Sequence, residues 1–334
     1  MNILFYCPFK FNIKSKKLFS LGGIESLNYE LSNELAKKKF NIYLATYCEK
    51  KTKRKNLINI PINNIIENKI NLNFDIIISS NDPNIFNKFK DAKKILWLHN
   101  TLSLEKSIRK KKFFSIIRNK ITAVYVSKYL REKTTKLFFF NKNLVINNFL
   151  SKNFVVQRLK LQRKKIIVWS VQREKGLKET INMWIKNIHH NNTKLNFYIL
   201  GVDKRKYKDK EKYFKDYNIY LLGRRSKKEL RNIYSKSLAM ICLGYDETFC
   251  LNALEANACG LPFLTFGHTA LKNYSKNNFN SYIVKDYNDL AKKICLISKH
   301  NKINKKIILN SHKVTKKYRI EKIIKLWIKL FKNI

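Results

Sequence analysis

The feature that most constrains this chain is a regular alternation of short apolar runs with amphipathic helical patterns. Between the first two apolar runs, Ile24, Leu27, Leu31 and Leu35 repeat at helical spacing, and the same rhythm continues along the chain. Strands that alternate with helices are typical of a parallel, doubly wound sheet. We expect strands at residues 2–7, 40–47, 74–80, 93–100, 122–127 and 143–148, and again at 165–171, 194–201, 218–223, 237–245 and 261–266.

The alternation is interrupted once, by a polar segment that we interpret as a linker, at residues 157–165. A chain of 334 residues also exceeds what one hydrophobic core usually serves. We therefore predict two α/β, Rossmann-like domains at 1–156 and 166–312, followed by a helix at 313–334. Ligands of such open sheets bind at the carboxyl ends of the strands, so we expect a cleft between the two domains there.

The net charge of the chain is +47, from 70 Lys and Arg against 23 Asp and Glu. One interpretation is compositional drift, because Lys, Asn, Ile and Phe are inflated together, as an AT-rich genome would produce. The other is a partner that carries phosphate, and a charge of this size attracts anionic lipid headgroups whatever its origin. An anionic membrane surface is therefore left open as a partner. Nucleic acid is not expected, because no RNP-like, zinc-finger or helix-turn-helix signature is present.

The cysteines indicate the compartment. Six are scattered without a CxxC pair, which is typical of reduced thiols in a cytosolic protein. The chain opens with no basic, apolar leader and contains no run of about 18 apolar residues that would span a bilayer. We expect a cytoplasmic protein, and a peripheral position on the inner face of the cell membrane is left open.

The most specific motif is YDETFCLNALEANACGLPFLTF, at residues 245–266. It predicts the end of a strand, a turn, a helix that begins near Thr248 and a stop at Gly260. A helix leaves its first backbone N–H groups without intrahelical acceptors, and such groups bind anions. The N–H groups of Thr248, Phe249 and Cys250 are therefore our candidates for holding a diphosphate.

Two glutamates accompany this predicted anion site. Glu247 lies in the turn, where a carboxylate would accept hydrogen bonds from sugar hydroxyls, and Glu255 lies about two turns along the helix, where it would reach a ribose diol. An ordinary amphipathic helix would explain the spacing but not the preceding strand and the Gly-x-Pro exit. The pattern E-x7-E within ETFCLNALEANACGLP resembles the retaining glycosyltransferases of the GT-B architecture, of the family 4 type (glycosyl transferases group 1).

The resemblance implies a second donor-binding segment at SVQREKGL, residues 170–177. The family places there an Arg/Lys pair that clasps the donor diphosphate, which makes Arg173 and Lys175 donor ligands, with Lys178 as a substitute. Two cations would offset the negative charge that develops on the leaving nucleotide. The chain departs from the family where Trp169 and Ser170 replace the usual Gly-Arg.

Two further sites follow from the resemblance. Gly22 and Gly23 are similar to the family's N-terminal glycine loop, which approaches the donor phosphates or the acceptor. His99 ends an apolar run where the family often carries a histidine that faces the donor sugar, so it is a catalytic candidate with Glu247. A plain loop and a structural histidine are the alternatives.

The resemblance implies the GT-B fold, in which the last helix crosses back to the N-terminal domain. The implied activity transfers a sugar from a nucleoside diphosphate sugar to a hydroxyl of a glycan or lipid-linked acceptor. It would proceed with retention and without a cofactor or metal, and no DxD motif is present. Envelope polysaccharide or lipopolysaccharide synthesis would suit such an enzyme.

Three alternatives remain open. The chain could be a sugar phosphorylase or an epimerase. It could instead be a basic nucleic-acid- or membrane-binding protein on a GT-B-like scaffold without catalysis. The last helix could lie on a membrane through Trp327 and Phe331 rather than brace the N-terminal domain.

Overall fold

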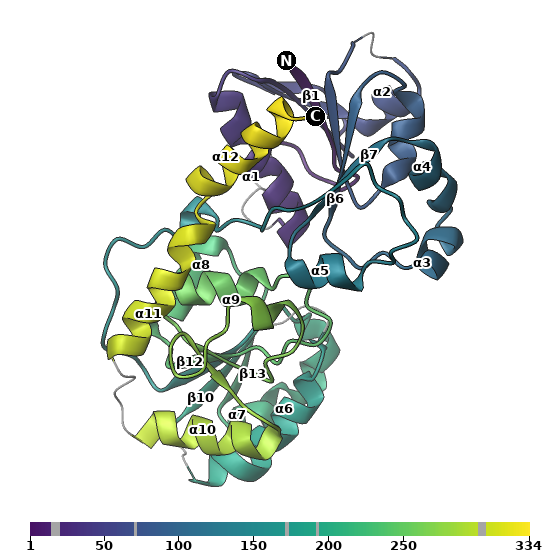
Figure 1. The fold of residues 1–334 in the computed structure, drawn as a ribbon. Helices are drawn as coiled ribbons and strands as arrows, with labels where there is room; N and C mark the ends of the chain where they lie inside the picture. The colour runs from purple at the N-terminus through teal and green to yellow at the C-terminus, as the bar shows by residue number, and fades with distance from the viewer. Residues whose placement is uncertain (15–20, 70–71, 171–173, 192–193, 300–304) are drawn as a thin grey trace. The chain divides into compact units, whose positions relative to one another are not determined.

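The computed structural model describes residues 1–14, 21–69, 72–170, 174–191, 194–299 and 305–334. The chain divides into two compact units (Figure 1). Unit 1 comprises residues 1–149 and 320–334, and unit 2 comprises residues 150–319.

Unit 1 is built on an eight-stranded sheet in the order β3-β4-β2-β1-β5-β6-β7-β8. All neighbouring strands are parallel except β3 and β4. The strands are β1 (Asn2–Tyr6), β2 (Asn41–Thr46), β3 (Thr52–Arg54), β4 (Leu57–Pro61), β5 (Ile76–Ser80), β6 (Lys93–Leu98), β7 (Ile121–Tyr125) and β8 (Lys142–Val145). The strand order reverses between β1 and β5, as in a doubly wound sheet.

The helices of unit 1 include the long amphipathic helix that the spacing predicts. Leu27, Leu31 and Leu35 of α1 are buried, and α1 contacts β2. The unit contains α1 (Gly23–Lys37), α2 (Ile62–Ile66), α3 (Leu104–Arg109), α4 (Phe113–Arg118), α5 (Lys128–Lys133) and α12 (Ile320–Lys332).

Helix α12 follows all of unit 2 in the chain but packs in unit 1. It contacts α1, and Figure 1 draws α12 in yellow and α1 in purple. The Trp327 ring lies 5.0 Å from that of Trp97, and the Phe331 ring lies 6.0 Å from that of Phe40. The predicted crossing helix is therefore confirmed. The alternative in which Trp327 and Phe331 lie on a membrane is wrong, because both side chains are buried.

Unit 2 is built on a six-stranded parallel sheet in the order β11-β10-β9-β12-β13-β14. Its strands are β9 (Ile166–Trp169), β10 (Asn196–Leu200), β11 (Ile219–Gly223), β12 (Ala239–Ile241), β13 (Phe263–Thr265) and β14 (Ser281–Ile283). If the six strands are numbered 1 to 6 along the chain, their order in the sheet is 3-2-1-4-5-6, which is the order of a dinucleotide-binding sheet. The strand order reverses between β9 and β12. The predicted fold of two Rossmann-like domains is confirmed.

The helices of unit 2 are α6 (Leu177–Met183), α7 (Glu211–Asp216), α8 (Lys227–Lys236), α9 (Leu251–Ala258), α10 (Tyr287–Lys299) and α11 (Lys305–Thr315). Helix α8 begins where expected, because Ser226 and Glu229 form a capping box. Residues 157–165 lie within this unit, where Arg163 donates hydrogen bonds to the carbonyls of Tyr234 and Cys259. Among the described residues, none of the helices has the length and hydropathy of a membrane-crossing segment.

Candidate functional site

The candidate site lies in unit 2 where its strand order reverses. Strands β9 and β12 are neighbours and run parallel, with Trp169 beside Ile241 at their carboxyl ends. Open α/β sheets bind ligands in the crevice outside this switch point, because the loops on its two sides diverge to opposite faces. The two motifs that the sequence singles out are the loops that leave these two strands.

An ion pair joins the two loops. The Lys175 Nζ lies 2.9 Å from the Asp246 Oδ2, and 31% of the Lys175 side chain is exposed. The next residue, Gly176, has a φ of +75°, and a Cβ built on it would lie 2.8 Å from the Tyr245 ring. A side chain at this position would therefore force the loops apart. The structure thus brings Lys175 beside the turn that carries Glu247.

Both loops contain non-glycine residues in the left-handed region. Glu174, Asp246 and Cys250 have φ values of 54°, 49° and 62°. This conformation is unfavourable for residues with a Cβ and persists only where surrounding contacts hold it, which is common at functional sites. The clustering of three such residues at one switch point supports a binding role for this edge of the sheet.

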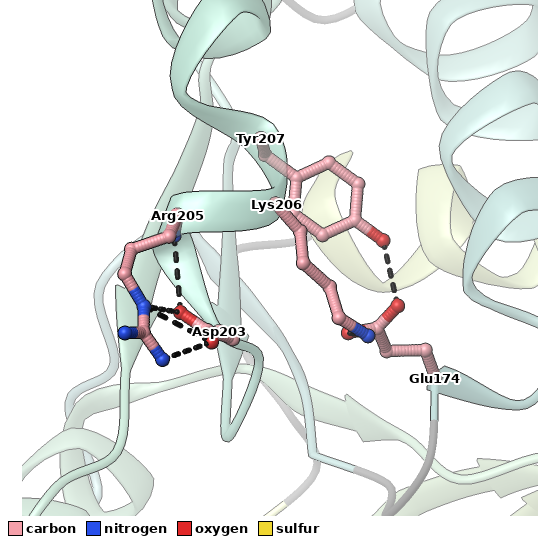
Figure 2. Close-up of polar contacts among 5 residues, drawn as sticks. All are labelled: Glu174, Asp203, Arg205, Lys206 and Tyr207. Carbon is pink, nitrogen blue, oxygen red and sulfur yellow. Dashed lines mark hydrogen bonds and ion pairs between the residues drawn. The ribbon is translucent and has the colours of Figure 1, made fainter.

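Glu174 is held by the loop that follows β10 (Figure 2). Its carboxylate accepts a hydrogen bond of 2.9 Å from the Tyr207 hydroxyl and pairs with the Lys206 Nζ at 3.3 Å. Burial, together with the Glu174 charge, raises the pKa of Tyr207 to about 12, so the phenol stays protonated and donates. Asp203 accepts from the Arg205 backbone N–H at 3.1 Å and shapes the same loop.

A third loop, after β13, fixes the backbone of the Glu247 turn. The Ala270 N–H donates to the Glu247 carbonyl at 3.1 Å, and the Thr269 hydroxyl donates to the Gly244 carbonyl at 2.8 Å. Thr269 has a φ of 62°, which is rare for a β-branched residue. Sequence reasoning missed Thr269, and the only signal was its position after an apolar run.

Helix α9 begins at Leu251, so the start expected near Thr248 is three residues too early. The reason is the left-handed conformation of Cys250, which is the N-cap. The Tyr274 hydroxyl contacts the carbonyls of Phe249 and Cys250, at 3.2 and 2.9 Å, and holds this turn in place. Thr248, Phe249 and Cys250 therefore precede the helix, and its first-turn N–H groups belong to residues 251–253.

The start of α9 is fixed against the end of β9. The Asn252 side chain donates a hydrogen bond of 2.8 Å to the Ser170 carbonyl, and the Tyr234 hydroxyl donates to the Ser170 Oγ at 3.1 Å. Glu255, one turn along α9, is 8% exposed. Burial raises the pKa of Tyr234, and the negative charge of Glu255 adds to this shift.

The other predicted site residues lie in unit 1. Gly22 is the N-cap of α1, and a Cβ built on it would lie 2.5 Å from the Glu25 carboxylate, so an anion at this helix start would meet a negative charge. His99 follows β6 and is buried, with its ring 4.5 Å from that of Trp97. Burial lowers the pKa of His99 to about 3, so its imidazole is neutral. The donor and catalytic roles of Gly22, Gly23 and His99 stay predictions.

Two further predictions concern Arg173 and a catalytic metal. Arg173 lies outside the described residues. Within the described ranges, no three His, Cys, Asp or Glu side chains come together in a group that could hold a metal ion. Metal-independent transfer stays a prediction.

Comparisons with known proteins give the site its context. The sequence profile described as "Glycosyl transferases group 1" matches residues 152–314. A search of curated proteins found no match. Among solved structures, the chain is similar to a sucrose-phosphate synthase from Thermosynechococcus elongatus, with a TM-score of 0.77 and 14% identity over 99% of this chain and 98% of the other.

Two further structures are similar over the full length. Anabaena HepE in complex with UDP and glucose has a TM-score of 0.70 and 13% identity, with 100% of both chains covered. WaaG, a glycosyltransferase involved in lipopolysaccharide biosynthesis, has a TM-score of 0.69 and 10% identity over 98% of this chain and 99% of the other. At these identities the likeness establishes the fold.

Proposed function

We propose that the chain transfers a sugar from a nucleoside diphosphate donor to an acceptor hydroxyl. Support comes from its GT-B fold and from the match of residues 152–314 to the family model described as "Glycosyl transferases group 1". The observation that carries the proposal is the ion pair between Lys175 and Asp246, at 2.9 Å. It joins the two predicted donor-binding loops at the switch point of the unit 2 sheet.

The donor diphosphate would bind between Lys175 and the start of α9. Lys175 supplies a positive charge, and residues 251–253 supply first-turn N–H groups. The Asp246 carboxylate pairs with Lys175, and 85% of the Asp246 side chain is exposed. It can therefore turn into solvent when the phosphates take its place, and the lysine would not have to be repositioned.

Glu247 and Glu255 would bind the donor sugar and the nucleoside, respectively. Glu247 is half-buried, with its backbone fixed by Ala270, and its carboxylate would accept hydrogen bonds from donor-sugar hydroxyls. Glu255 would bind the ribose diol. Neutral His99 would donate one hydrogen bond to a sugar hydroxyl, and Gly22 and Gly23 would approach the donor phosphates or the acceptor.

We propose that the transfer retains the anomeric configuration. The bond from the anomeric carbon to the diphosphate oxygen breaks, and the acceptor oxygen forms a new bond on the same face of the sugar. The leaving diphosphate takes the proton of the acceptor hydroxyl, so the protein need not supply a base. Lys175, Arg173 and the start of α9 would stabilise the charge that develops on the diphosphate.

For the acceptor, we propose a glycan or a lipid-linked glycan of envelope polysaccharide or lipopolysaccharide synthesis. Support comes from the charge of +47, which would attract the chain to an anionic membrane where such acceptors are assembled. The enzyme would then work peripherally, from the cytoplasmic side.

The test is turnover with UDP-, GDP- and ADP-sugars. We expect one donor to release its nucleoside diphosphate slowly to water and faster with acceptor, and Glu247→Gln and Glu255→Gln each to lower kcat about 100-fold or more. The matched control is Glu211→Gln, because Glu211 is an exposed glutamate that pairs with Lys215 of the same helix.

The alternatives give different products. A phosphorylase would form a sugar phosphate from inorganic phosphate, and an epimerase would change the donor without releasing nucleotide. Full activity in both glutamate variants would refute the site, and no turnover with any donor in the wild-type chain would favour a binding protein without catalysis.

A further inference from the structure

Unit 1 exposes a group of large apolar side chains on and beside α3 and α4. We call this group the α3–α4 patch, and it consists of Ile108, Phe114, Ile117, Leu137 and Phe139, which are 57%, 65%, 59%, 59% and 93% exposed. Single exposed apolar residues are common on protein surfaces, but a contiguous group usually marks an interaction site.

Helix α4 buries one polar and one apolar side chain, Ser115 and Ile116, and exposes two large apolar ones. Ser115 is buried, accepts a hydrogen bond from the Asn87 side chain at 2.9 Å and donates to the Asn84 side chain at 2.8 Å. Phe114 and Ile117, one turn apart, are exposed. Burial in unit 1 therefore does not account for the two large apolar side chains on the outward face of α4.

The segment that follows α5 presents its apolar side chains in the same way. Phe138 and Phe140 are buried with their rings 6.0 Å apart, and the Phe138 ring lies 6.5 Å from that of Phe113 in α4. Leu137 and Phe139 alternate with them and point outward. Because the buried phenylalanines anchor the segment to α4, Leu137 and Phe139 belong to the same surface as Phe114.

The surroundings of the α3–α4 patch are strongly basic. Residues 104–142 contain twelve Lys and Arg against two Glu. The exposed cations include Arg109, Lys110, Lys111, Arg118, Lys120 and Lys136. The Arg118 guanidinium lies 5.5 Å from the centre of the Phe114 ring, so a charge and an apolar tip stand side by side.

We propose that the α3–α4 patch docks on a bilayer that contains anionic phospholipids. Apolar tips surrounded by cations match an interface where acyl chains lie beneath negative headgroups. Ile108, Ile117 and Leu137 have no ring to stack on bases, which disfavours RNA. A second copy would bring two basic surfaces together. The inference rests on the proposed membrane location of the enzyme and not on its sugar chemistry.

The experiment is flotation of the full chain with vesicles of phosphatidylglycerol and phosphatidylcholine in equal parts, and with vesicles of phosphatidylcholine alone. We expect binding to the anionic vesicles only. The variant Phe114→Ser/Ile117→Ser/Leu137→Ser/Phe139→Ser should lower the partition coefficient about tenfold or more, because four apolar tips are lost while the net charge stays the same.

The matched control is Leu296→Ser/Leu309→Ser, which changes two exposed leucines in helices of unit 2 and should leave binding unchanged. Release of nucleoside diphosphate from the donor, measured without vesicles, should be equal in all three proteins. Loss of that release would concern the proposed function and not the patch.

Four outcomes would overturn the inference. They are no binding of the wild-type chain to anionic vesicles, undiminished binding of the patch variant, and equal loss in the control variant. In the fourth, the patch substitutions leave vesicle binding intact. They instead abolish either self-association, measured by sedimentation velocity, or binding to single-stranded RNA.

Discussion

At the scale of single residues, Lys175 in the loop after β9 and Lys178 in α6 should behave differently. Lys175 faces Asp246 across the switch point, whereas Lys178 is exposed on α6. We expect Lys175→Met to lower kcat/KM for the donor about 10- to 100-fold, because a hydrogen bond between charged groups is lost. Steady-state kinetics with Lys178→Met as the control would check this, and equal effects of both substitutions would contradict the assignment.

His99 should make the folded chain sensitive to acid. Its pKa is about 3 in the folded state against an ordinary 6.5, so only the unfolded state takes up this proton as the pH falls below 6.5. The contribution to stability is therefore lost from pH 6.5 towards pH 3, and at pH 5 the loss is about 2 kcal/mol.

The measurement is the free energy of unfolding in urea at pH 7 and pH 5. His99→Gln should flatten the difference between the two pH values, because glutamine does not ionise. His190→Gln is the control, since His190 is exposed. An unchanged pH dependence in the His99 variant would mean that the imidazole is accessible to protons.

The residues of the candidate site were predictable to different degrees. Lys175 and the turn of Glu247 follow strands that the apolar runs make visible, so their meeting at one sheet edge follows from the strand order. The partners Asp246, Tyr207 and Thr269 were not predictable. Each depends on a left-handed residue or on a contact between distant loops, and neither leaves a periodic pattern in the sequence.

At the scale of the elements, α12 should contribute strongly to unit 1. Trp327 is fully buried against Trp97, whereas its neighbour Leu326 is 46% exposed. We expect Trp327→Ala to lower the free energy of unfolding by about 3–5 kcal/mol, since it leaves a large cavity. Leu326→Ala should have a small effect. Urea unfolding followed by circular dichroism measures both, and equal losses would mean that α12 does not dock through its apolar face.

The long elements were predictable, and the short ones and some boundaries were not. The apolar runs of β1, β5 and β10 and the helical spacing of α1 are where expected, because burial imposes their patterns. Strand β4 was missed, because LINIP is short and ends in Pro61, which the sheet tolerates close to its edge. The start of α9 was misplaced, because the backbone of Cys250 overrides the helical pattern.

At the scale of the whole molecule, the donor should stabilise one unit selectively. The predicted nucleotide contacts Lys175, Glu255 and the start of α9 all belong to unit 2. A nucleoside diphosphate at about 100 times its Kd should stabilise that unit by about 2.7 kcal/mol. Calorimetry should therefore show a rise in one unfolding transition.

The variant Trp327→Ala identifies that transition, because it lowers the transition of unit 1. A nucleoside monophosphate is the control ligand and should shift the unit 2 transition less, since it lacks the second phosphate. If the nucleoside diphosphate raised only the unit 1 transition, which Trp327→Ala lowers, the nucleotide would bind unit 1 and the prediction would be contradicted.

The return of α12 to unit 1 also affects how the chain folds during synthesis. A ribosome makes residues 1–149 first, yet the Trp97 surface of unit 1 receives its cover only after residues 150–319 have been translated. The unit that is started first is therefore the last to be completed, and unit 2 can fold beforehand. A chain stalled before Ile320 would expose that apolar surface to chaperones and proteases, so quality control can recognise an unfinished copy.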